Sequence, residues 1–187
     1  MNKKKLALFM FSNDQEAAYL ANALIEKGWN IKASLENMEI LEKQGVKREH
    51  LTPFYWGASE SFITPSDRTI LSLRSRAKDR AYMEKKGIPR VDLVCVDFYA
   101  VKDHSQGSRW LFRSMKMESA KIFLLMAAIE GGRIPVCHPH ERKDVADWIA
   151  SGMPNKKNYL LRFTSSALLG IAQELLALGS YCDRLRQ

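Results

Sequence analysis

The chain has 187 residues, of which 46% are hydrophobic and 27% are charged, and its formal net charge is +8. This balance fits one globular domain with a substantial core, and it excludes a collagen-like or disordered chain. No apolar run approaches the roughly 20 residues that a membrane-spanning helix needs, so we expect no membrane span.

The cysteines and the charge limit the compartment and the partners. Cys95, Cys137 and Cys182 are an odd number of cysteines at wide spacing, which is typical of reduced thiols in a cytoplasmic protein. The 29 basic residues outnumber the 21 acidic ones, which favours an anionic partner such as nucleic acid, an acidic membrane or a phosphorylated small molecule. Charge alone does not choose among these partners.

Strand and helix patterns alternate in the first part of the chain. The run KLALFMF predicts a buried strand over residues 5–11 rather than a signal peptide, because its six apolar residues are too few and stop at Ser12. An amphipathic helix over residues 15–27 ends at Gly28. Next we predict a strand over 29–34, a helix over 37–43 closed by Gly45, and an irregular region over 46–66.

The same alternation continues to the end of the chain. TILSL, residues 69–73, predicts a short strand or a turn of helix, and SRAKDRAYMEKKG predicts a charged helix over 75–87. GIPRVDLVCVDFY, residues 87–99, has the strongest strand pattern. The remaining predictions are a polar loop over 102–114, helices over 118–129, 140–152 and 165–185, and a strand over 133–137.

This order of elements predicts one α/β domain over residues 1–187, with a mainly parallel sheet and helices on both faces. No internal repeat or interdomain linker interrupts it. Ligands bind such sheets at the carboxyl ends of the strands, which is where Asp97 and Tyr99 fall. We therefore expect a ligand cleft at the end of the strand over residues 87–99.

GIPRVDLVCVDFYAV resembles the strand G-I-x-P-I-D-L-V-V-V-N-L-Y-P-F of the IMP cyclohydrolase domain of the bifunctional purine-biosynthesis enzyme. KLALFMFSNDQEAAYLANALIEKGW is similar to that family's first strand and helix, ESAKIFLLMAAIEGG to its segment D-I-G-G-P-T-M-L-R-A-A-A-K-N, and LLRFTSSALLGIAQELLALGSY to its closing helix. The resemblance implies a three-layer domain of methylglyoxal-synthase-like fold. It also implies ring closure of formyl-aminoimidazole carboxamide ribotide to IMP by a homodimer that needs no metal or organic cofactor.

The resemblance implies which residues form the site. Tyr99 matches the family's active-site tyrosine, and Glu118 falls where the family has its catalytic aspartate. Ser12 and Ser34 match serines on the phosphate side, while Asp97 replaces an asparagine. The catalytic candidates are Tyr99 and Glu118, and the ligand-binding candidates are Ser12, Asn13, Ser34, Arg68 and Asp97.

The chain departs from the family at several cationic and glycine positions. The loop S-T-G-G-T becomes ASLEN, so Leu35 and Glu36 replace two glycines that would let backbone amides approach a phosphate. The lysine of A-A-K-N becomes Glu130. Other anion donors would be needed, such as Arg68, Arg74, Arg109, Lys116 or Lys121. A second hypothesis is therefore a diverged, non-catalytic binder of a nucleotide or phosphometabolite.

Each of these candidates also has a purely structural explanation. Tyr99 fits an aromatic ring that covers the core, Asp97 a cap on the following turn, and Glu118 an acid at the start of a helix. In CHPHE, residues 137–141, Cys137 and two histidines are zinc-type ligands. Their one- and two-residue spacing after a strand favours an ordinary loop, so we predict no metal site.

The basic run RSRAKDRAYMEKK, residues 74–86, has two interpretations. It fits the solvated face of a helix, and it also fits a segment that follows a nucleic-acid backbone. No recognition motif accompanies the charge, which makes nucleic acid the less favoured partner. The third hypothesis is a basic nucleic-acid or partner-binding protein that has kept only the fold.

Overall fold

The computed structural model describes residues 4–54, 67–74, 77–98 and 107–184. Within this part of the chain, five parallel strands form one sheet in the order β3-β2-β1-β4-β5. The strands are β1 (Leu6–Met10), β2 (Asn30–Ala33), β3 (Leu51–Pro53), β4 (Leu93–Val96) and β5 (Ile134–Val136). The predicted α/β class with a parallel sheet is confirmed.

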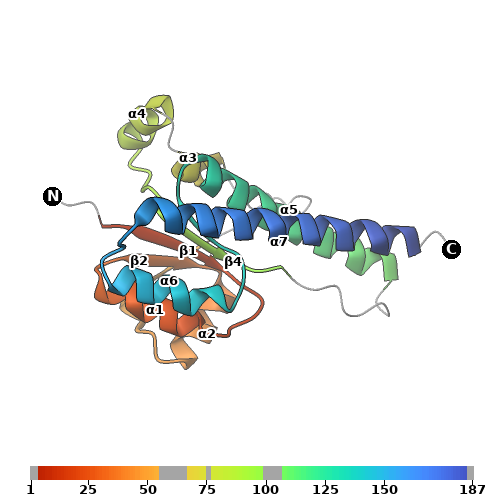
Figure 1. Cartoon of the computed structure of the whole chain (residues 1–187), viewed down its shortest axis with the longest axis horizontal. Coiled ribbons are helices and arrows are strands. Elements are labelled where there is room, and N and C mark those ends of the chain that lie inside the picture. The colour runs from red at the N-terminus through yellow and green to blue at the C-terminus, as the bar shows by residue number, and fades with distance from the viewer. Residues whose placement is uncertain (1–3, 55–66, 75–76, 99–106, 185–187) are drawn as a thin grey trace.

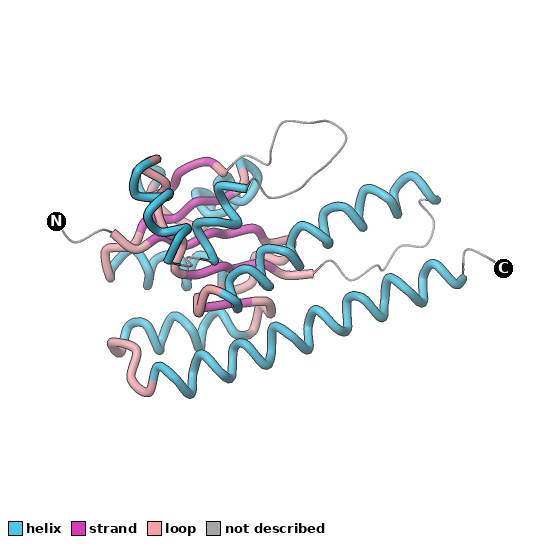
Figure 2. Tube along the Cα trace, turned by 90° about the horizontal axis from the view of Figure 1, so that it is seen from above, coloured by secondary structure: helices cyan, strands magenta, loops and turns pink. Residues whose placement is uncertain are grey.

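Helices cover both faces of the sheet, as predicted (Figure 1). On one face lie α1 (Ala17–Glu26), α2 (Leu35–Lys43) and α6 (Glu141–Ala150). On the other lie α3 (Asp67–Arg74), α5 (Gly107–Glu130) and α7 (Lys156–Arg184), and next to α3 comes α4 (Ala77–Lys85). Figure 2 shows that α5 and α7 are much longer than the strands and run past the carboxyl edge of the sheet.

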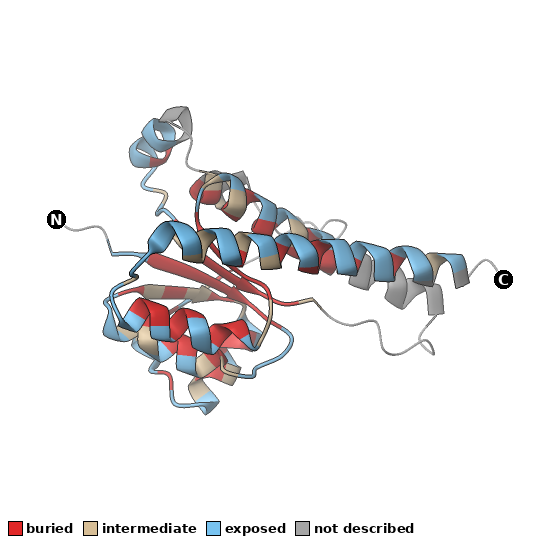
Figure 3. Ribbon diagram, in the orientation of Figure 1, coloured by how far each residue is buried: buried red, intermediate tan, exposed pale blue. Residues whose placement is uncertain are grey.

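Strands β1, β4 and β5 are buried on both faces, which explains their continuous apolar sequences (Figure 3). Ala7 and Phe9 of β1 belong to the core under α1 and α6, whereas Leu6, Leu8 and Met10 belong to the core under α3, α5 and α7. The alternation follows from the two-residue period of a strand. Both cores are therefore built from the same strands, and the three layers form a single unit.

Two glycine stops predicted from the sequence are confirmed. Gly28 follows the end of α1 with φ +77°, and Gly45 follows the end of α2 with φ +91°. Left-handed backbone of this kind costs a residue with a Cβ free energy but costs glycine almost nothing. A 3₁₀ turn over Arg48–His50 then leads into β3.

Two boundaries differ from the predictions. Strand β3 lies in the region predicted to be irregular; its Pro53 is tolerated because β3 is at the edge of the sheet. For TILSL, the helical alternative of the prediction is confirmed, since the segment is part of helix α3. Helix α5 begins at Gly107, so the predicted loop is wrong from that residue on; no glycine or proline interrupts residues 108–130, and polarity alone does not break a helix.

Two further elements differ in length. Strand β4 occupies only Leu93–Val96 of the strand predicted over 87–99, and α7 begins at Lys156 rather than at residue 165. Among the described residues, no helix combines the length and hydropathy that crossing a bilayer requires.

Candidate functional site at the carboxyl edge of the sheet

The candidate site lies where β1 and β4 end. The chain leaves β1 toward α1 on one face and leaves β4 toward α5 on the other. Neighbouring parallel strands whose connections diverge in this way form a crevice outside their carboxyl ends. Ser12 and Asn13 follow β1, and Asp97 follows β4, so three of the predicted ligand-binding residues meet there.

Asp97 joins the ends of the two strands. Its carboxylate accepts hydrogen bonds from the backbone amides of Ser12, at 2.6 Å, and Asn13, at 3.1 Å. It also accepts one from the Nη2 of Arg142 at 2.6 Å. Asp97 is only 3% exposed, and its oxygens are occupied by these three donors. Among the described residues, its contacts are thus with the β1–α1 loop and with Arg142 of α6.

Arg142 completes this arrangement from helix α6. Its side chain is fully buried, its Nη1 donates to the carbonyl oxygens of Asn13 and Gln15, and its guanidinium lies 5.1 Å from the centre of the Phe11 ring. A buried cation of this kind needs both a counter-charge and hydrogen-bond acceptors. The β1–α1 loop supplies the acceptors and Asp97 the counter-charge, so the loop has one preferred shape.

Helix α2 attaches to the same edge. The Ser34 hydroxyl oxygen caps α2 by accepting from the backbone amide of Asn37 at 3.2 Å. The buried Asn37 side chain accepts from the Phe11 amide at 3.0 Å and donates to the Phe11 carbonyl at 2.8 Å. Ser34 therefore has a structural role as a helix cap, close to the end of β1.

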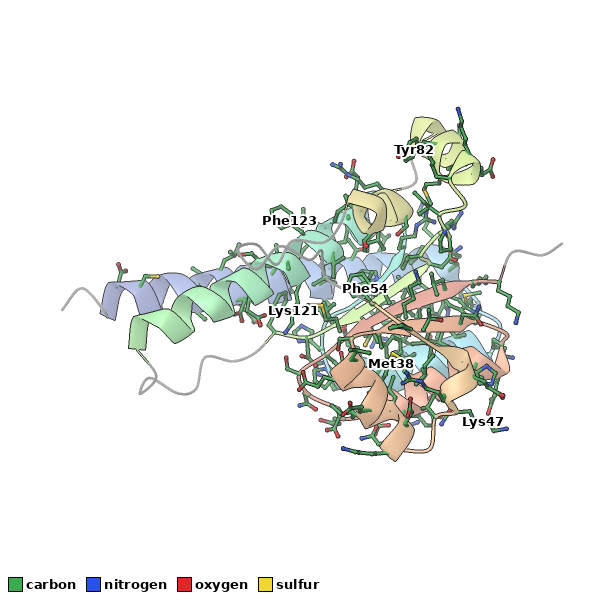
Figure 4. All side chains as sticks on the ribbon, turned by 180° about the vertical axis from the view of Figure 1, so that it is seen from behind. Met38, Lys47, Phe54, Tyr82, Lys121 and Phe123 are labelled. Carbon is green, nitrogen blue, oxygen red and sulfur yellow. The ribbon has the colours of Figure 1, made fainter. Side chains whose placement is uncertain are left out.

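A buried ion pair lies on the opposite side of the β1–α1 loop. The Lys121 Nζ donates to the Ser12 Oγ at 3.0 Å and to the Glu118 Oε1 at 3.1 Å. Both charged side chains are 3% exposed. Figure 4 shows Lys121 on α5 beside the ends of the strands. The structure thus brings Ser12 and Glu118 together through a lysine.

Helix α7 adds a second carboxylate to this cluster. Glu174 is 6% exposed, and its Oε1 has no hydrogen-bond partner among the described residues. Burial, together with the negative charge of Glu118, raises the pKa of Glu174 to about 7, although Lys121 opposes the shift. We call Ser12, Glu118, Lys121 and Glu174 the acid–lysine cluster. It contains a carboxyl group able to gain or lose a proton near neutral pH.

Glu118 does not act as an acid at a helix start. It lies well inside α5, whose first residue is Gly107, so this structural explanation is wrong. Tyr99 lies outside the described residues. Arg68 lies in the first turn of α3, and its side chain is not described. The structure therefore places Ser12, Asn13, Asp97 and Glu118 at one edge and leaves the roles of Tyr99 and Arg68 as predictions.

Arg142 and Glu174 were not predicted as site residues, although each has an unusual position in the sequence. Arg142 shares a helix face with the buried Val145 and Ile149, and Glu174 shares one with the buried Ile171 and Leu178. Ionisable residues rarely occupy an apolar stripe unless they are paired or functional. That signal also applies to Lys121, which sequence analysis proposed only as one of several alternative anion donors.

The segment CHPHE forms an ordinary loop between β5 and α6. The Glu141 carboxylate accepts from the amides of Cys137 and His138, and the rings of His138 and His140 stack at 5.3 Å. Burial raises the pKa of the Cys137 thiol to about 12, so this group is not a thiolate nucleophile at neutral pH. In the part of the chain described here, no three His, Cys, Asp or Glu side chains gather to hold a metal ion.

Comparison with known proteins shows the fold of this chain but not its function. No protein-family model matches this chain, and no curated protein matches it. Among solved structures, 23 chains are similar. One is described as "Crystal structure of ForH"; it has 19% sequence identity and a TM-score of 0.73, and the match covers 96% of this chain and 99% of that one. At this identity the likeness shows a shared three-layer α/β fold along nearly the whole of both chains.

Proposed function

We propose that this chain is an IMP cyclohydrolase-like protein that binds a phosphorylated purine ribonucleotide precursor at the carboxyl edge and closes its second ring. The observation that carries the proposal is the acid–lysine cluster. Lys121 contacts both Ser12, which the resemblance places on the phosphate side, and Glu118, which it places at the catalytic acid. Lys121 thus supplies positive charge in a site where the family's own lysines are replaced.

The ring closure needs groups that exchange protons. The carboxamide nitrogen attacks the formyl carbon, two nitrogens each give up one proton, and the formyl oxygen takes both and leaves as water. A buried ammonium such as Lys121 stabilises negative charge on that oxygen and can donate a proton to it. Glu118 and Glu174 are the acceptors for the nitrogen protons. Tyr99 is the further proton-transfer candidate that the resemblance implies.

A non-catalytic binder is the second candidate, and two observations favour it. The amides of Ser12 and Asn13 are occupied by Asp97, so they do not face a ligand. Leu35 is 50% exposed and Glu36 stands in the first turn of α2, where the family's glycines would admit a phosphate. A site with fewer backbone donors binds a phosphate more weakly. This is expected of a protein that binds a nucleotide without converting it.

Ligand-dependent thermal stability tests the binding step. At 100 times its dissociation constant, a purine ribonucleotide stabilises the fold by about 2.7 kcal/mol, roughly 5–11 °C for a domain of this size. We expect such a shift with IMP or the formylated ribotide and its loss in Lys121→Met. Lys156→Gln, which removes an exposed charge from α7, is the control and should keep the shift.

Turnover separates the two candidates. Release of IMP from the formylated ribotide by the wild type, but not by Glu118→Gln or Tyr99→Phe, supports the cyclohydrolase. A thermal shift without turnover supports the non-catalytic binder. No shift with any purine ribonucleotide at millimolar concentration would refute both and would leave a resemblance of fold alone.

The protein is also proposed to be a cytoplasmic homodimer. All three cysteines are free thiols in the structure, which fits a reducing compartment. Exposed leucines on α7 recur at seven-residue spacing: Leu161, Leu168 and Leu175, with Leu169 and Leu176 beside them. Such a stripe fits the same helix of a second copy. Light scattering should give twice the chain mass, and Leu168→Glu with Leu175→Glu should halve it.

A further inference from the structure

A cavity lies at the amino edge of the sheet, away from the acid–lysine cluster. It has a volume of about 680 Å³ and opens between α4 and the residues that precede β1 and β4. Figure 1 shows α4 on the same side of the molecule as the start of the chain. The basic segment that precedes β4 therefore lines a cavity, which its sequence alone did not indicate.

The cavity walls carry more positive than negative charge. Lys4, Lys5, Arg80 and Arg90 line it, and the acids among its lining residues are Glu84 and Asp92. Asp92 is already engaged, because Arg90 Nε lies 2.8 Å from its Oδ1 and Arg133 Nη1 lies 3.9 Å from the same oxygen. The lining therefore keeps a formal charge of +2, the difference between four cations and two anions.

Arg80 lines the cavity from α4, and its side chain is exposed. It makes no hydrogen bond and no ion pair with any residue that the structure describes, although it faces the cavity from α4. Its charge and that of Arg90 add to the effect of burial in lowering the pKa of Arg133, while Asp92 opposes the shift. An anion in the cavity would meet the positive charges of Arg80 and Arg90 together with those of the two lysines.

The remaining walls are apolar. Met83 is buried at 4% exposure, and Ile88 and Pro89 continue the same surface. A volume of about 680 Å³ lies within the range of cavities that hold small molecules, roughly 300–1,000 Å³. A ligand with an apolar or aromatic body on Met83 and Pro89 could place its anionic groups against Arg80 and the lysines. The combined shape and charge fit a nucleoside polyphosphate.

We propose that the amino-edge cavity is a second binding site, which takes a small molecule with two or more phosphate groups and an aromatic body. It is separate from the proposed substrate site at the opposite edge and does not depend on that function. A single-stranded RNA would also meet the basic face of α4, on which Tyr82 is exposed (Figure 4). The cavity volume of about 680 Å³ favours the small molecule, because a single strand binds along a groove that spans several nucleotides.

Calorimetric titration of the full chain with ATP and with pyrophosphate tests this proposal. We expect ATP to bind the wild type more tightly than pyrophosphate, because only ATP reaches the apolar wall. Arg80→Gln should weaken ATP binding about tenfold or more, since it removes a charge-assisted contact. Lys85→Gln removes an exposed charge from the same helix outside the cavity, and it should change binding less than twofold.

Each other outcome of the titration either supports the proposal or overturns it. ATP binding that survives in Lys121→Met but falls in Arg80→Gln places ATP at the amino edge and supports the proposal, whatever happens to the carboxyl-edge site. Equal losses in Arg80→Gln and Lys85→Gln, or no ATP binding to the wild type at millimolar concentration, overturn it. Tight binding of single-stranded RNA that is lost in Arg80→Gln and that millimolar ATP does not displace also overturns it, because Arg80 would then serve a polymer.

Discussion

Glu174 makes the stability of this protein depend on pH in a direction opposite to that of a salt-bridged carboxylate. Its pKa rises from an ordinary value of 4.5 to about 7 in the folded protein. Between these values the folded state binds more protons than the unfolded state. The free energy of unfolding therefore falls as pH rises from about 4.5 to 7, and it levels off above pH 7.

The magnitude follows from the size of that shift. One pKa unit corresponds to 1.36 kcal/mol, so the ionised Glu174 side chain costs the fold about 3 kcal/mol at pH 8. Replacing it by glutamine keeps the shape and removes the charge. We expect Glu174→Gln to be more stable than the wild type by about 3 kcal/mol at pH 8 but by only about 1 kcal/mol at pH 5. For a chain of 187 residues, the difference at pH 8 is roughly 6–12 °C in melting temperature.

Thermal and urea unfolding of both proteins at pH 5 and pH 8 would measure this difference. Asp183→Asn removes an exposed carboxylate from the same helix and should give curves that match the wild type at both pH values. The reasoning is refuted if Glu174→Gln is destabilised at pH 8, because Glu174 would then have to be a paired carboxylate. A gain of equal size at pH 5 and pH 8 would also refute it, since the gain would not come from titration.

Three comparisons between variants test the architecture around the site, each by urea unfolding. Asp97→Asn leaves the buried guanidinium of Arg142 without its counter-charge and should cost about 3–5 kcal/mol, much of which the double variant with Arg142→Met should recover; no recovery would contradict the pairing. Asn37→Ala removes both hydrogen bonds to Phe11 and should cost about 2–3 kcal/mol, whereas Ser34→Ala removes only the cap of α2 and should cost about 1 kcal/mol. Gly170→Ala should destabilise by about 1–3 kcal/mol, because its Cβ would lie 3.0 Å from Cys137 Sγ and 3.3 Å from the His138 ring. Gly179→Ala, on the same helix with open space around it, should stabilise by up to about 1 kcal/mol, and equal effects at the two glycines would contradict the close contact.

The layered fold could be predicted because local patterns specify it. The continuous apolar runs of β1 and β4 indicated strands covered on both sides, and Gly28 and Gly45 marked the ends of helices. The element boundaries that were predicted wrongly depend on contacts between elements far apart in the sequence. Gly107 stands among polar residues, which favour a loop by local pattern although α5 begins there, and nothing in LTP shows that it pairs with β2 at the edge of the sheet.

The site could be predicted only in part, for a related reason. The position relative to a strand end placed Asp97 at the carboxyl edge, and the family resemblance placed Ser12 on the phosphate side of the expected site. The partners of those residues lie far away along the chain, on α5 and α6, and no local pattern pairs them. Lys121 and Arg142 became recognisable only when the helices were packed against the sheet.

Asp97 also explains how this site would hold an anion differently from the family that it resembles. An asparagine there has one acceptor oxygen, whereas the carboxylate accepts two loop amides and a guanidinium together. The exchange therefore requires a buried cation, which Arg142 provides, and it turns the loop amides away from the crevice. In the proposed site, charge for a phosphate must then come from side chains, and Lys121, which donates to Ser12, supplies it. Leu35 and Glu36, where the family that this sequence resembles has glycines, agree with the proposal, because a site that binds a phosphate through side chains does not need residues that expose backbone amides.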